Sequence, residues 1–391
     1  MEYKIHIAMI SVGGGHSSPA RALENALKKK NKDYSIFVSD FWDYIGEKEF
    51  DTQHKNMWAY MLKHTMVPRL CYYIQDFGGA LTRSITRRIW RKPIARAVEW
   101  FKENPPDLFI STHFLNVIPA YLARKKYPEL KFPIALIGTD PNDISALWIW
   151  KKIDYLIVFS NRARIKSLNR GFSPKNIRTF SYPVRKEFVS PEVDKNALRE
   201  RYGIDPGKLT LMISSGSEGR GKIEKVIGEL LKNDVPCNCL VVCGRNREFY
   251  ESLHNMKTAG KNFNLVPFEF LQNINEIIAI SDFVVIKAGA ASTYESLVMH
   301  KPIIFYDYVS QNEKSNINFA LRRGLGWHVR GPKKLVELIL AVIKYPVFLN
   351  EKRDNFFGLD FSTGAAEVAQ FLDEIIESHV NFPRKYITKG P

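Results

Sequence analysis

The sequence predicts an α/β protein with two domains, each built on a parallel sheet with helices on both faces. Apolar runs of strand length alternate with longer amphipathic stretches along most of the chain, and this alternation is typical of parallel sheets. Each half also begins with a strand, a glycine-rich turn and a helix, near residue 5 and again near residue 209. A chain of 391 residues is long enough for two cores of ordinary size.

The first predicted strand, Ile5–Ser11, runs into a turn that carries three glycines and a histidine. Pro19 suits the first turn of the helix that follows. Gly14 and Gly15 let the backbone approach a ligand closely, although their spacing does not match the GxGxxG dinucleotide fingerprint. We expect His16 at the carboxyl edge of the sheet, where open α/β sheets bind ligands. The alternative is a helix-start histidine that is hydrogen-bonded to backbone.

The first predicted domain covers residues 1–188. Its sheet continues through strands at Tyr34–Asp40, Asp107–Ser111, Pro133–Thr139, Tyr155–Ser160 and Ile177–Tyr182.

Residues 54–102 interrupt this alternation and are rich in aromatic and basic side chains. Basic residues recur at near-helical spacing over Arg83–Lys102, with Ile85, Ile89 and Trp90 between them. This pattern is typical of a basic amphipathic helix that lies in an anionic membrane surface. The alternative is a solvated basic face on a helix that is packed by its aromatic residues.

Residues 189–207 are polar, contain two prolines and are predicted to be a linker. The second predicted domain covers residues 208–362. A last segment, residues 363–391, holds a helix over Ala365–Ser378, which we expect to cross back to the first domain, and a short basic tail. The strands expected in the second domain are Leu209–Ser215, Cys239–Gly244, Asn264–Phe268, Phe283–Lys287 and Lys301–Asp307.

The stretch that follows Phe283–Lys287 has the properties of a phosphate-binding turn. Residues 288–291 carry no side chain larger than a methyl group, and Ser292 and Thr293 are good N-cap residues, so a helix is expected to begin there. The bare N–H groups at such a helix start bind phosphate. Glu295 is expected in the first turn, where its carboxylate could accept hydrogen bonds from ribose hydroxyls. The alternative is a plain βαβ unit.

Residues 311–316 form a polar cluster that is expected to be a loop. Its amide and acid side chains suit the hydroxyl groups of a sugar.

Composition limits the class of protein. The net charge of +16 predicts attraction to polyanions such as nucleic acid, anionic lipid or phosphorylated substrates. The chain has no RNP, KH or zinc-finger pattern, so we expect no nucleic-acid binding. Four cysteines are too few for a disulfide framework and are interpreted as reduced thiols in a cytoplasmic protein. We expect neither a signal peptide nor a membrane-spanning helix.

Eight short motifs occur in one order along nearly the whole chain. They are Gly13–His16, Ser111–His113, Thr139-Asp140 with Trp148, Pro183–Arg185, Glu218–Glu224, Cys243–Asn246, Lys287–Gly289 with Glu295, and Glu313 with Asn316. Together they resemble the GT-B glycosyltransferases of the monogalactosyldiacylglycerol synthase and processive diacylglycerol glucosyltransferase group. They are more distantly similar to the N-acetylglucosaminyltransferase that forms lipid II.

The resemblance implies a GT-B fold, in which two Rossmann-like domains face each other across a cleft. It implies inverting transfer of galactose or glucose from a UDP-sugar to diacylglycerol or a related glycolipid, with no separate cofactor. A peripheral protein on the cytoplasmic face of the cell membrane is expected, docked through residues 54–102. Two alternatives stay open: a polyprenyl-linked or cell-surface saccharide as acceptor, and a GT-B epimerase acting on UDP-N-acetylglucosamine.

The resemblance also implies residue roles. His16 is the candidate base, and Asp140 is an orienting group or an alternative base. Gly219 and Gly221, with Ala290, Ala291 and Ser292, would hold the diphosphate, and Glu295 would bind the ribose. The remaining predicted ligand-binding residues are Phe268 and Glu269 beside uracil, Asn312, Glu313 and Asn316 facing the hexose, and Gly14, Gly15 and Arg245. The chain has no Asp-x-Asp signature, so no metal held by such a motif is expected.

The chain departs from the family pattern at three places. Ser145 stands where the family often carries a histidine. Ala290-Ala291-Ser292 replaces a glycine-rich turn, and Gln311-Asn312 replaces Gly-Gln. These differences leave the acceptor and the identity of the sugar open.

Overall fold

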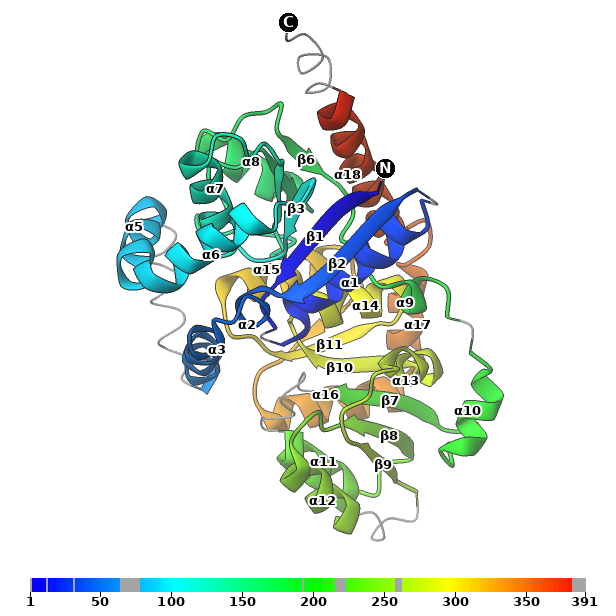
Figure 1. Ribbon diagram of the computed structural model, residues 1–391. Coiled ribbons are helices and arrows are strands. Elements are labelled where there is room, and N and C mark those ends of the chain that lie inside the picture. The colour runs from blue at the N-terminus through cyan, green and yellow to red at the C-terminus, as the bar shows by residue number, and fades with distance from the viewer. Residues whose placement is uncertain are drawn as a thin grey trace, which may run out of the picture. The chain divides into compact units, whose positions relative to one another are not determined.

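The computed structural model describes residues 2–11, 13–30, 32–63, 78–191, 193–214, 223–256 and 262–381. The chain forms two compact units. The first unit comprises Met1–Arg185, Val309–Asn312 and Ser362–Pro391, and the second comprises Lys186–Tyr308 and Glu313–Phe361. Each unit holds a six-stranded sheet (Figure 1) in which the paired strands are parallel. Two parallel sheets with helices packed on them confirm the predicted α/β class.

The sheet of the first unit has the strand order β2-β1-β3-β4-β5-β6. Its strands are β1 (Tyr3–Met9), β2 (Tyr34–Asp40), β3 (Leu108–Ser111), β4 (Ile134–Ile137), β5 (Tyr155–Val158) and β6 (Ile177–Thr179). The direction in which strands are added reverses between β1 and β3, which pair with each other through Ile7 and Ile110. Consequently, the turns that leave β1 and β3 lie side by side at the carboxyl edge of the sheet, where open α/β sheets bind ligands.

Helices surround this sheet. They are α1 (Gly14–Lys28), α2 (Phe41–Tyr44), α3 (Lys48–Lys63), α5 (Gly79–Ile89), α6 (Arg91–Glu103), α7 (Val117–Lys126), α8 (Asn161–Asn169) and α18 (Gly364–Asn381). The last helix of the chain, α18, packs along α1 at the other end of the sequence (Figure 1).

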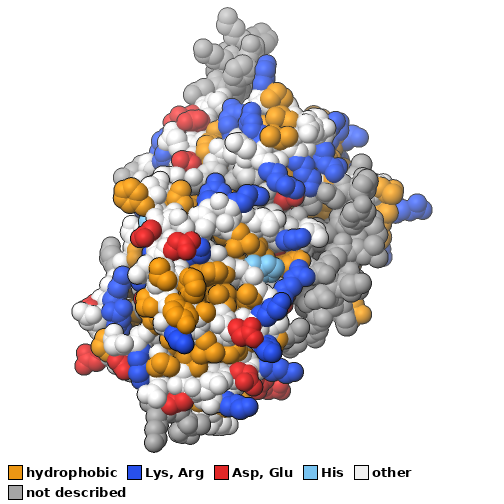
Figure 2. Space-filling view, turned by 180° about the vertical axis from the view of Figure 1, so that it is seen from behind, with side chains coloured by type: hydrophobic (Ala, Val, Ile, Leu, Met, Phe, Trp, Pro, Cys, Tyr) orange, Lys and Arg blue, Asp and Glu red, His pale blue; other side chains and the backbone are white. Residues whose placement is uncertain are grey.

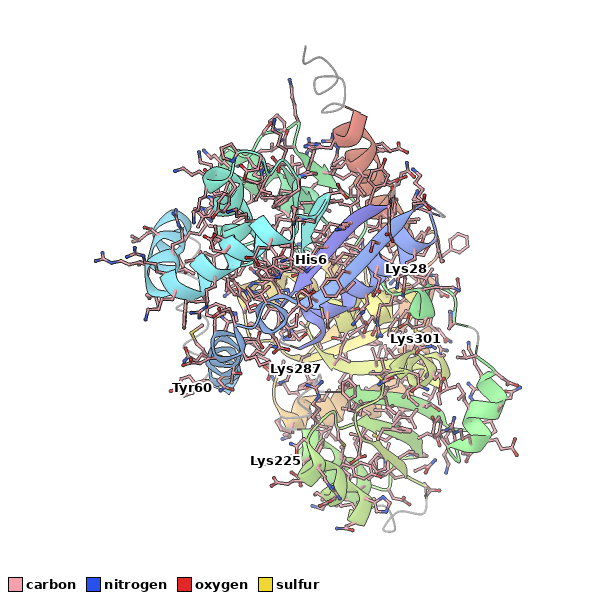
Figure 3. The ribbon with its side chains drawn as sticks, viewed as in Figure 1. His6, Lys28, Tyr60, Lys225, Lys287 and Lys301 are labelled. Carbon is pink, nitrogen blue, oxygen red and sulfur yellow. The ribbon has the colours of Figure 1, made fainter. Side chains whose placement is uncertain are left out.

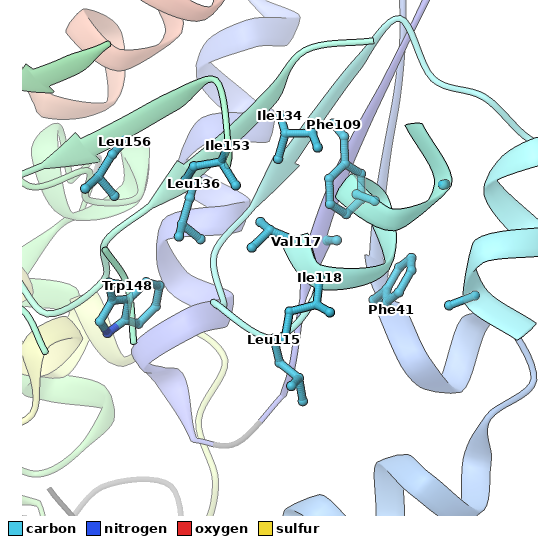
Figure 4. Close-up of a cluster of buried hydrophobic side chains, with 14 of the residues drawn as sticks. Phe41, Phe109, Leu115, Val117, Ile118, Ile134, Leu136, Trp148, Ile153 and Leu156 are labelled. Atoms are coloured by element: carbon cyan, nitrogen blue, oxygen red, sulfur yellow. The ribbon is translucent and has the colours of Figure 1, made fainter. Parts of the chain in front are cut away.

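The core of the first unit is continuous from the sheet to α7 and to the loop before β5 (Figure 4). Val117 and Ile118 of α7 are 1% exposed, and Trp148 is 3% exposed within the same cluster. Trp148 is therefore held by core packing, although it belongs to a loop.

Two expectations for the first unit are wrong. The first helix begins at Gly14, so Pro19 lies inside it and His16 lies in its first turn. The basic block 83–102 is two helices that part at Trp90, not one. The second of these, α6, buries Ile94 and Phe101 in the core, because its apolar residues follow the helical repeat on the face toward the sheet.

The sheet of the second unit has the order β12-β11-β10-β7-β8-β9. Its strands are β7 (Leu209–Ser214), β8 (Cys237–Val242), β9 (Asn264–Phe268), β10 (Phe283–Lys287), β11 (Ile303–Asp307) and β12 (Gly326–His328). Taken in chain order this is the 3-2-1-4-5-6 arrangement of the Rossmann fold, with its reversal between β7 and β10. The helices are α9 (Lys186–Val189), α10 (Lys195–Arg201), α11 (Ile223–Lys232), α12 (Arg247–Met256), α13 (Ile274–Ile280), α14 (Ala290–Val298), α15 (Gln311–Arg322), α16 (Pro332–Lys344) and α17 (Pro346–Asp354).

Two local expectations for the second half also fail. Gly289 is the N-cap of α14, so Ser292 and Thr293 lie inside the helix and Glu295 falls in its second turn. The polar cluster 311–316 is the start of α15 and not a loop. Polar side chains on one face of a helix and in a loop look alike in sequence, because neither shows an apolar repeat.

Within the described residues, none of the helices is both long and apolar enough to cross a membrane. The described cysteines, Cys237, Cys239 and Cys243, are buried free thiols.

Candidate active site

The turn after β1 places His16 at the carboxyl edge of the first sheet. Gly13 has φ of 69°, a conformation that glycine adopts without strain, and it turns the chain directly into α1. Gly14 and Gly15 are the first two residues of the helix, and His16 is the third. Among the described atoms, a Cβ added to Gly15 would meet nothing within 4 Å. Glycine at this position therefore leaves open space beside the histidine.

Backbone and side-chain partners determine the tautomer of His16. Its Nδ1 lies 2.8 Å from the carbonyl oxygen of Thr112 and 2.9 Å from Oγ1 of Thr139. A carbonyl oxygen only accepts, so Nδ1 must carry the ring proton. Nε2 is then the unprotonated nitrogen. Burial lowers the pKa of His16 to about 4, with a smaller contribution from the charge of His54, while the hydrogen bond to Thr112 opposes the shift, so the imidazole is neutral at pH 7.

The turn after β3 brings a second imidazole to His16. The rings of His16 and His113 are 4.8 Å apart and nearly perpendicular, at 80°. The backbone N–H of Leu115 donates to Nδ1 of His113 over 3.2 Å, so the ring proton of His113 is on Nε2. Burial holds the pKa of His113 well below its ordinary value. The two rings therefore have opposite tautomers.

A third histidine, His54 of α3, lies 5.6 Å from His113, ring to ring. Burial lowers its pKa to about 4. No local pattern in the sequence indicates this neighbour, because His54 is 38 residues after His16 and belongs to the aromatic and basic segment 54–102. His113 belongs to the Ser111–His113 motif, but the sequence indicates no role for it.

Asp140 is the third residue of the loop that follows β4. Its Oδ2 accepts from Nε1 of Trp148 over 2.8 Å. Asn312, which groups with the first unit, also donates to this oxygen, over 2.6 Å. The ring of Trp148 lies 6.0 Å from that of His16. Ser145, at the position of the family histidine, is buried in the same loop.

In the second unit, the turn after β10 forms an uncapped helix start. Lys287 ends the strand (Figure 3). Gly289 has φ −62° and ψ 142°, and no side chain of the described residues caps α14. Ala290, Ala291 and Ser292 occupy the first turn, whose backbone N–H groups have no acceptor within the helix. Because β10 borders the reversal of strand order, this is the edge at which Rossmann folds bind ligands.

The residues behind this turn hold its shape. Nδ2 of Asn316 donates to the carbonyl of Ala288 over 2.8 Å, which joins α15 to the turn. Glu295 is 7% exposed in the second turn of α14, and Glu313 is partly buried in the first turn of α15. Of these side chains, that of Asn316 contacts the turn itself, although 28 residues separate it from Ala288 in the sequence.

The residues predicted beside the uracil ring differ in exposure. Phe268 is buried and packs edge-on against Tyr202, with ring centroids 5.0 Å apart, whereas Glu269 is exposed. Phe270 was not singled out from the sequence, yet it is 48% exposed and lies 5.1 Å below the guanidinium of Arg245. The predicted Gly219 and Gly221 lie outside the described residues.

Among the residues that the structure describes, no three His, Cys, Asp or Glu side chains converge as metal ligands.

Comparison with known families identifies both halves of the chain. Residues 16–184 match the family model of monogalactosyldiacylglycerol (MGDG) synthase, and residues 210–368 match that of the glycosyltransferase family 28 C-terminal domain.

Individual relatives agree with these matches. The chain is 28% identical over 376 residues to a processive diacylglycerol beta-glucosyltransferase of Bacillus licheniformis, covering 95% of this chain and 94% of that protein. It is 26% identical over 354 residues to a probable monogalactosyldiacylglycerol synthase of Nicotiana tabacum, covering 86% of this chain. The chain spans just under two thirds, 64%, of the length of that plant relative.

Solved structures share the fold. MurG of Acinetobacter baumannii superposes with a TM-score of 0.59 at 14% identity, over 95% of this chain and 99% of that one. S. aureus MnaA, from a co-structure with UDP, gives a TM-score of 0.61 at 14% identity, over 100% and 99% of the two chains. At these identities the likeness shows the fold alone, and it agrees with the fold predicted from the motifs.

Proposed function

Because this chain belongs to the GT-B glycosyltransferases of the monogalactosyldiacylglycerol synthase and diacylglycerol glucosyltransferase group, we propose that it transfers a hexose to a lipid hydroxyl. The donor is a UDP-sugar carrying glucose or galactose, and the acceptor is diacylglycerol or a related glycolipid. The observation that carries the proposal is the state of His16, a neutral imidazole whose Nδ1 is engaged by Thr112 and whose Nε2 is left as a base.

In the proposed reaction the acceptor hydroxyl attacks the anomeric carbon of the donor. The proton of that hydroxyl passes to Nε2 of His16 as the new C–O bond forms. The bond from the anomeric carbon to the UDP oxygen breaks, and UDP leaves with the electron pair. The carbonyl of Thr112 accepts from Nδ1–H and so stabilises the imidazolium that results. Attack opposite the leaving group inverts the configuration of the sugar.

The helix start at α14 supports the donor side of the proposal. Its free N–H groups and its dipole favour a diphosphate, and they stabilise the charge that UDP gains on leaving. We assign the diphosphate to Ala290, Ala291 and Ser292 together with Gly219 and Gly221. Glu295 would take the ribose hydroxyls, and Phe268, Glu269 and Arg245 the nucleobase. The hexose hydroxyls would contact Asn312, Glu313 and Asn316.

The surface of α5 supports action at a membrane. Leu81, Ile85 and Ile89 are 65%, 48% and 65% exposed, and Arg87 and Arg88 are exposed on the same helix. Lys and Arg side chains are spread over the face shown in Figure 2 and do not form one patch there. On that face, charge alone does not locate a docking surface. The exposed apolar side chains of α5 favour this helix. The site of action we propose is the cytoplasmic face of an anionic bilayer.

The test is a transfer assay on the purified protein. UDP-glucose, UDP-galactose and UDP-N-acetylglucosamine are each offered with diacylglycerol in anionic vesicles, and the lipids are separated by chromatography. We expect a glycosylated diacylglycerol from one or both of the hexose donors, and none from a His16→Ala protein that still binds UDP. Conversion of UDP-N-acetylglucosamine without any lipid product would instead favour an epimerase, and transfer only to a polyprenyl carrier would change the acceptor class.

A further inference from the structure

We propose that His113 is a second substrate-binding imidazole, whose Nε2–H donates to an oxygen adjacent to the hydroxyl that His16 deprotonates. This inference rests on the proposed transferase function and specifies the class of acceptor that the first unit recognises.

The two imidazoles form a complementary pair. The carbonyl of Thr112 accepts from His16 at Nδ1, whereas the N–H of Leu115 donates to His113 at Nδ1. In each ring the backbone contact engages Nδ1, so that Nε2 is the nitrogen that can contact a substrate. His16 offers a lone pair at Nε2, and His113 offers a proton at Nε2. The ring centroids are 4.8 Å apart, close enough for one molecule with two oxygens on neighbouring carbon atoms to contact both rings.

Packing prevents His113 from changing its orientation. Its ring stacks on Phe114 at 4.4 Å and 28°, and it meets Trp148 edge-on at 6.2 Å and His54 at 5.6 Å. Only 6% of the residue is exposed. Burial also keeps the ring neutral, because a protonated imidazole would lose its hydration there. His113 is consequently a fixed, uncharged donor beside a fixed, uncharged acceptor.

This pair predicts an acceptor with a hydroxyl and a second oxygen on the neighbouring carbon. The glycerol unit of diacylglycerol has that arrangement, a free hydroxyl next to an ester-bearing carbon. A simple long-chain alcohol has the hydroxyl but not the neighbouring oxygen. A buried donor left without its partner is costly, so the pair would discriminate against the simple alcohol.

Two variants separate the roles of the two nitrogens. His113→Asn keeps an acceptor near the Nδ1 position for Leu115 N–H but has no donor at the Nε2 position. His113→Gln has an amide donor near the Nε2 position but loses the Leu115 contact. The measurement is kcat/KM for diacylglycerol divided by kcat/KM for a long-chain primary alcohol in the same vesicles. We expect His113→Asn to lower this ratio about tenfold or more, and His113→Gln to keep most of it.

Thermal stabilisation by UDP serves as the check that each variant is folded. A folded His113→Asn protein that discriminates like the wild type would overturn the inference. If that variant does not fold, a folded His113→Gln protein without discrimination would overturn it equally. A wild-type protein that glycosylates neither acceptor would refute the proposed function itself, and an active wild type with an unaltered His113→Asn ratio would refute only the role of His113.

Discussion

His6 and His16 show how the surroundings of one side chain determine its chemistry. Both imidazoles are kept neutral by burial, but only His16 lies at the carboxyl edge of the sheet. His6 lies within β1 (Figure 3) and is packed among aromatic rings, including Phe37, Phe109 and Trp100. Its Nε2 is 2.7 Å from Oγ of Ser39, and burial lowers its pKa to about 3. His6 therefore acts as an apolar core residue with one hydrogen bond.

The first prediction concerns His6 and acid stability. Below pH 6.5 the unfolded chain binds a proton at His6, whereas the folded protein does not until about pH 3, so this residue lowers stability as pH falls. Between pH 7 and pH 5 the free energy of unfolding should fall by about 2 kcal/mol because of His6. Urea unfolding of wild type and His6→Gln at both pH values measures it. The variant should lose about 2 kcal/mol less than wild type over this interval, and equal losses would contradict the assignment.

The second prediction concerns the pH dependence of transfer. The pKa of His16 is lowered to about 4, so its Nε2 stays unprotonated far below the ordinary histidine range. The titratable side chains that the structure shows near it are His113 of the β3 turn, which contacts its ring, and His54 of α3, which lies against His113. We expect kcat/KM to stay level from neutral pH to about pH 5 and to fall only near pH 4. A midpoint near 6.5 would mean that His16 is not the base, and circular dichroism at each pH excludes unfolding.

At the scale of single elements, the first turn of α14 is the part of the second unit that we assign to phosphate. Among the residues that the structure describes, no side chain caps this turn, and its own side chains are small. The geometry of Gly289, with ψ of 142°, is the one that a residue before proline prefers. Proline is also tolerated in the first turn of a helix, because the N–H that it lacks has no partner there.

The third prediction uses this tolerance. Ala290→Pro removes one backbone N–H from the start of α14 without removing an intrahelical hydrogen bond, whereas Ala290→Ser keeps the N–H. A lost hydrogen bond to a charged phosphate is worth about 1.5–3 kcal/mol, so UDP should bind to Ala290→Pro roughly 10- to 100-fold more weakly. Calorimetric titration with UDP measures the change. Equal affinities in folded Ala290→Pro and Ala290→Ser would show that this amide does not contact the nucleotide.

The helix α5 combines exposed apolar side chains with basic ones, but not all of its arginines face solvent. Nη1 of Arg83 donates to the carbonyl of Ala146 over 3.0 Å, in the loop that carries Trp148. Arg87 and Arg88 are exposed. Of the three arginines of α5, only Arg87 and Arg88 are therefore expected to contact anionic lipid.

The fourth prediction follows from that division. Each basic residue near an anionic leaflet contributes about 1 kcal/mol, so Arg87→Gln with Arg88→Gln should weaken vesicle binding by about 2 kcal/mol, roughly 30-fold. The matched control is Lys225→Gln with Lys232→Gln, which removes two exposed charges from α11 of the second unit. Flotation with anionic vesicles at low and high salt measures both. Equal weakening by the two pairs would mean that net charge alone drives binding.

At the scale of the whole molecule, the chain returns to the unit in which it began. Asp373 of α18 is 4% exposed, and it accepts hydrogen bonds from Lys32, over 2.8 Å, and from the hydroxyl of Tyr34. Glu377, one turn later, also pairs with Lys32, but its side chain is 59% exposed. The buried carboxylate is thus the main polar link between the last helix and the start of β2.

The fifth prediction compares these two carboxylates. Asp373→Ala removes the carboxylate that accepts hydrogen bonds from Lys32 and from the hydroxyl of Tyr34. This variant should lower the free energy of unfolding of the first unit by about 1–3 kcal/mol. Glu377→Gln, at an exposed pair, should change it by less than about 1 kcal/mol. Tryptophan fluorescence during urea unfolding reports this unit, since six of the seven tryptophans precede residue 151. Similar effects of both variants would contradict the packing of α18 described here.

The sequence alone predicted most of the strands and the residues at their ends, although it did not predict the short edge strand β12. Apolar runs such as Phe283–Lys287 and Asn264–Phe268 have the bounds predicted for them. A strand that is buried on both faces of a parallel sheet is a nearly continuous apolar run, which can be recognised in the sequence. The motifs predicted which family the chain belongs to, and the comparisons confirm it. Glycine-rich turns after strands were also visible, because few other residues permit such close backbone approach.

Only the tertiary structure decided where α1 and α14 begin, which side of α6 is buried, and which tautomer each histidine adopts. The helix starts depend on the backbone angles of Gly13 and Gly289, which composition does not specify. The grouping of His16, His54 and His113 depends on strand order, which brings β1 beside β3 across about 100 residues of sequence. Local patterns record what a segment buries, but the partners of a polar side chain are determined by contacts between distant segments.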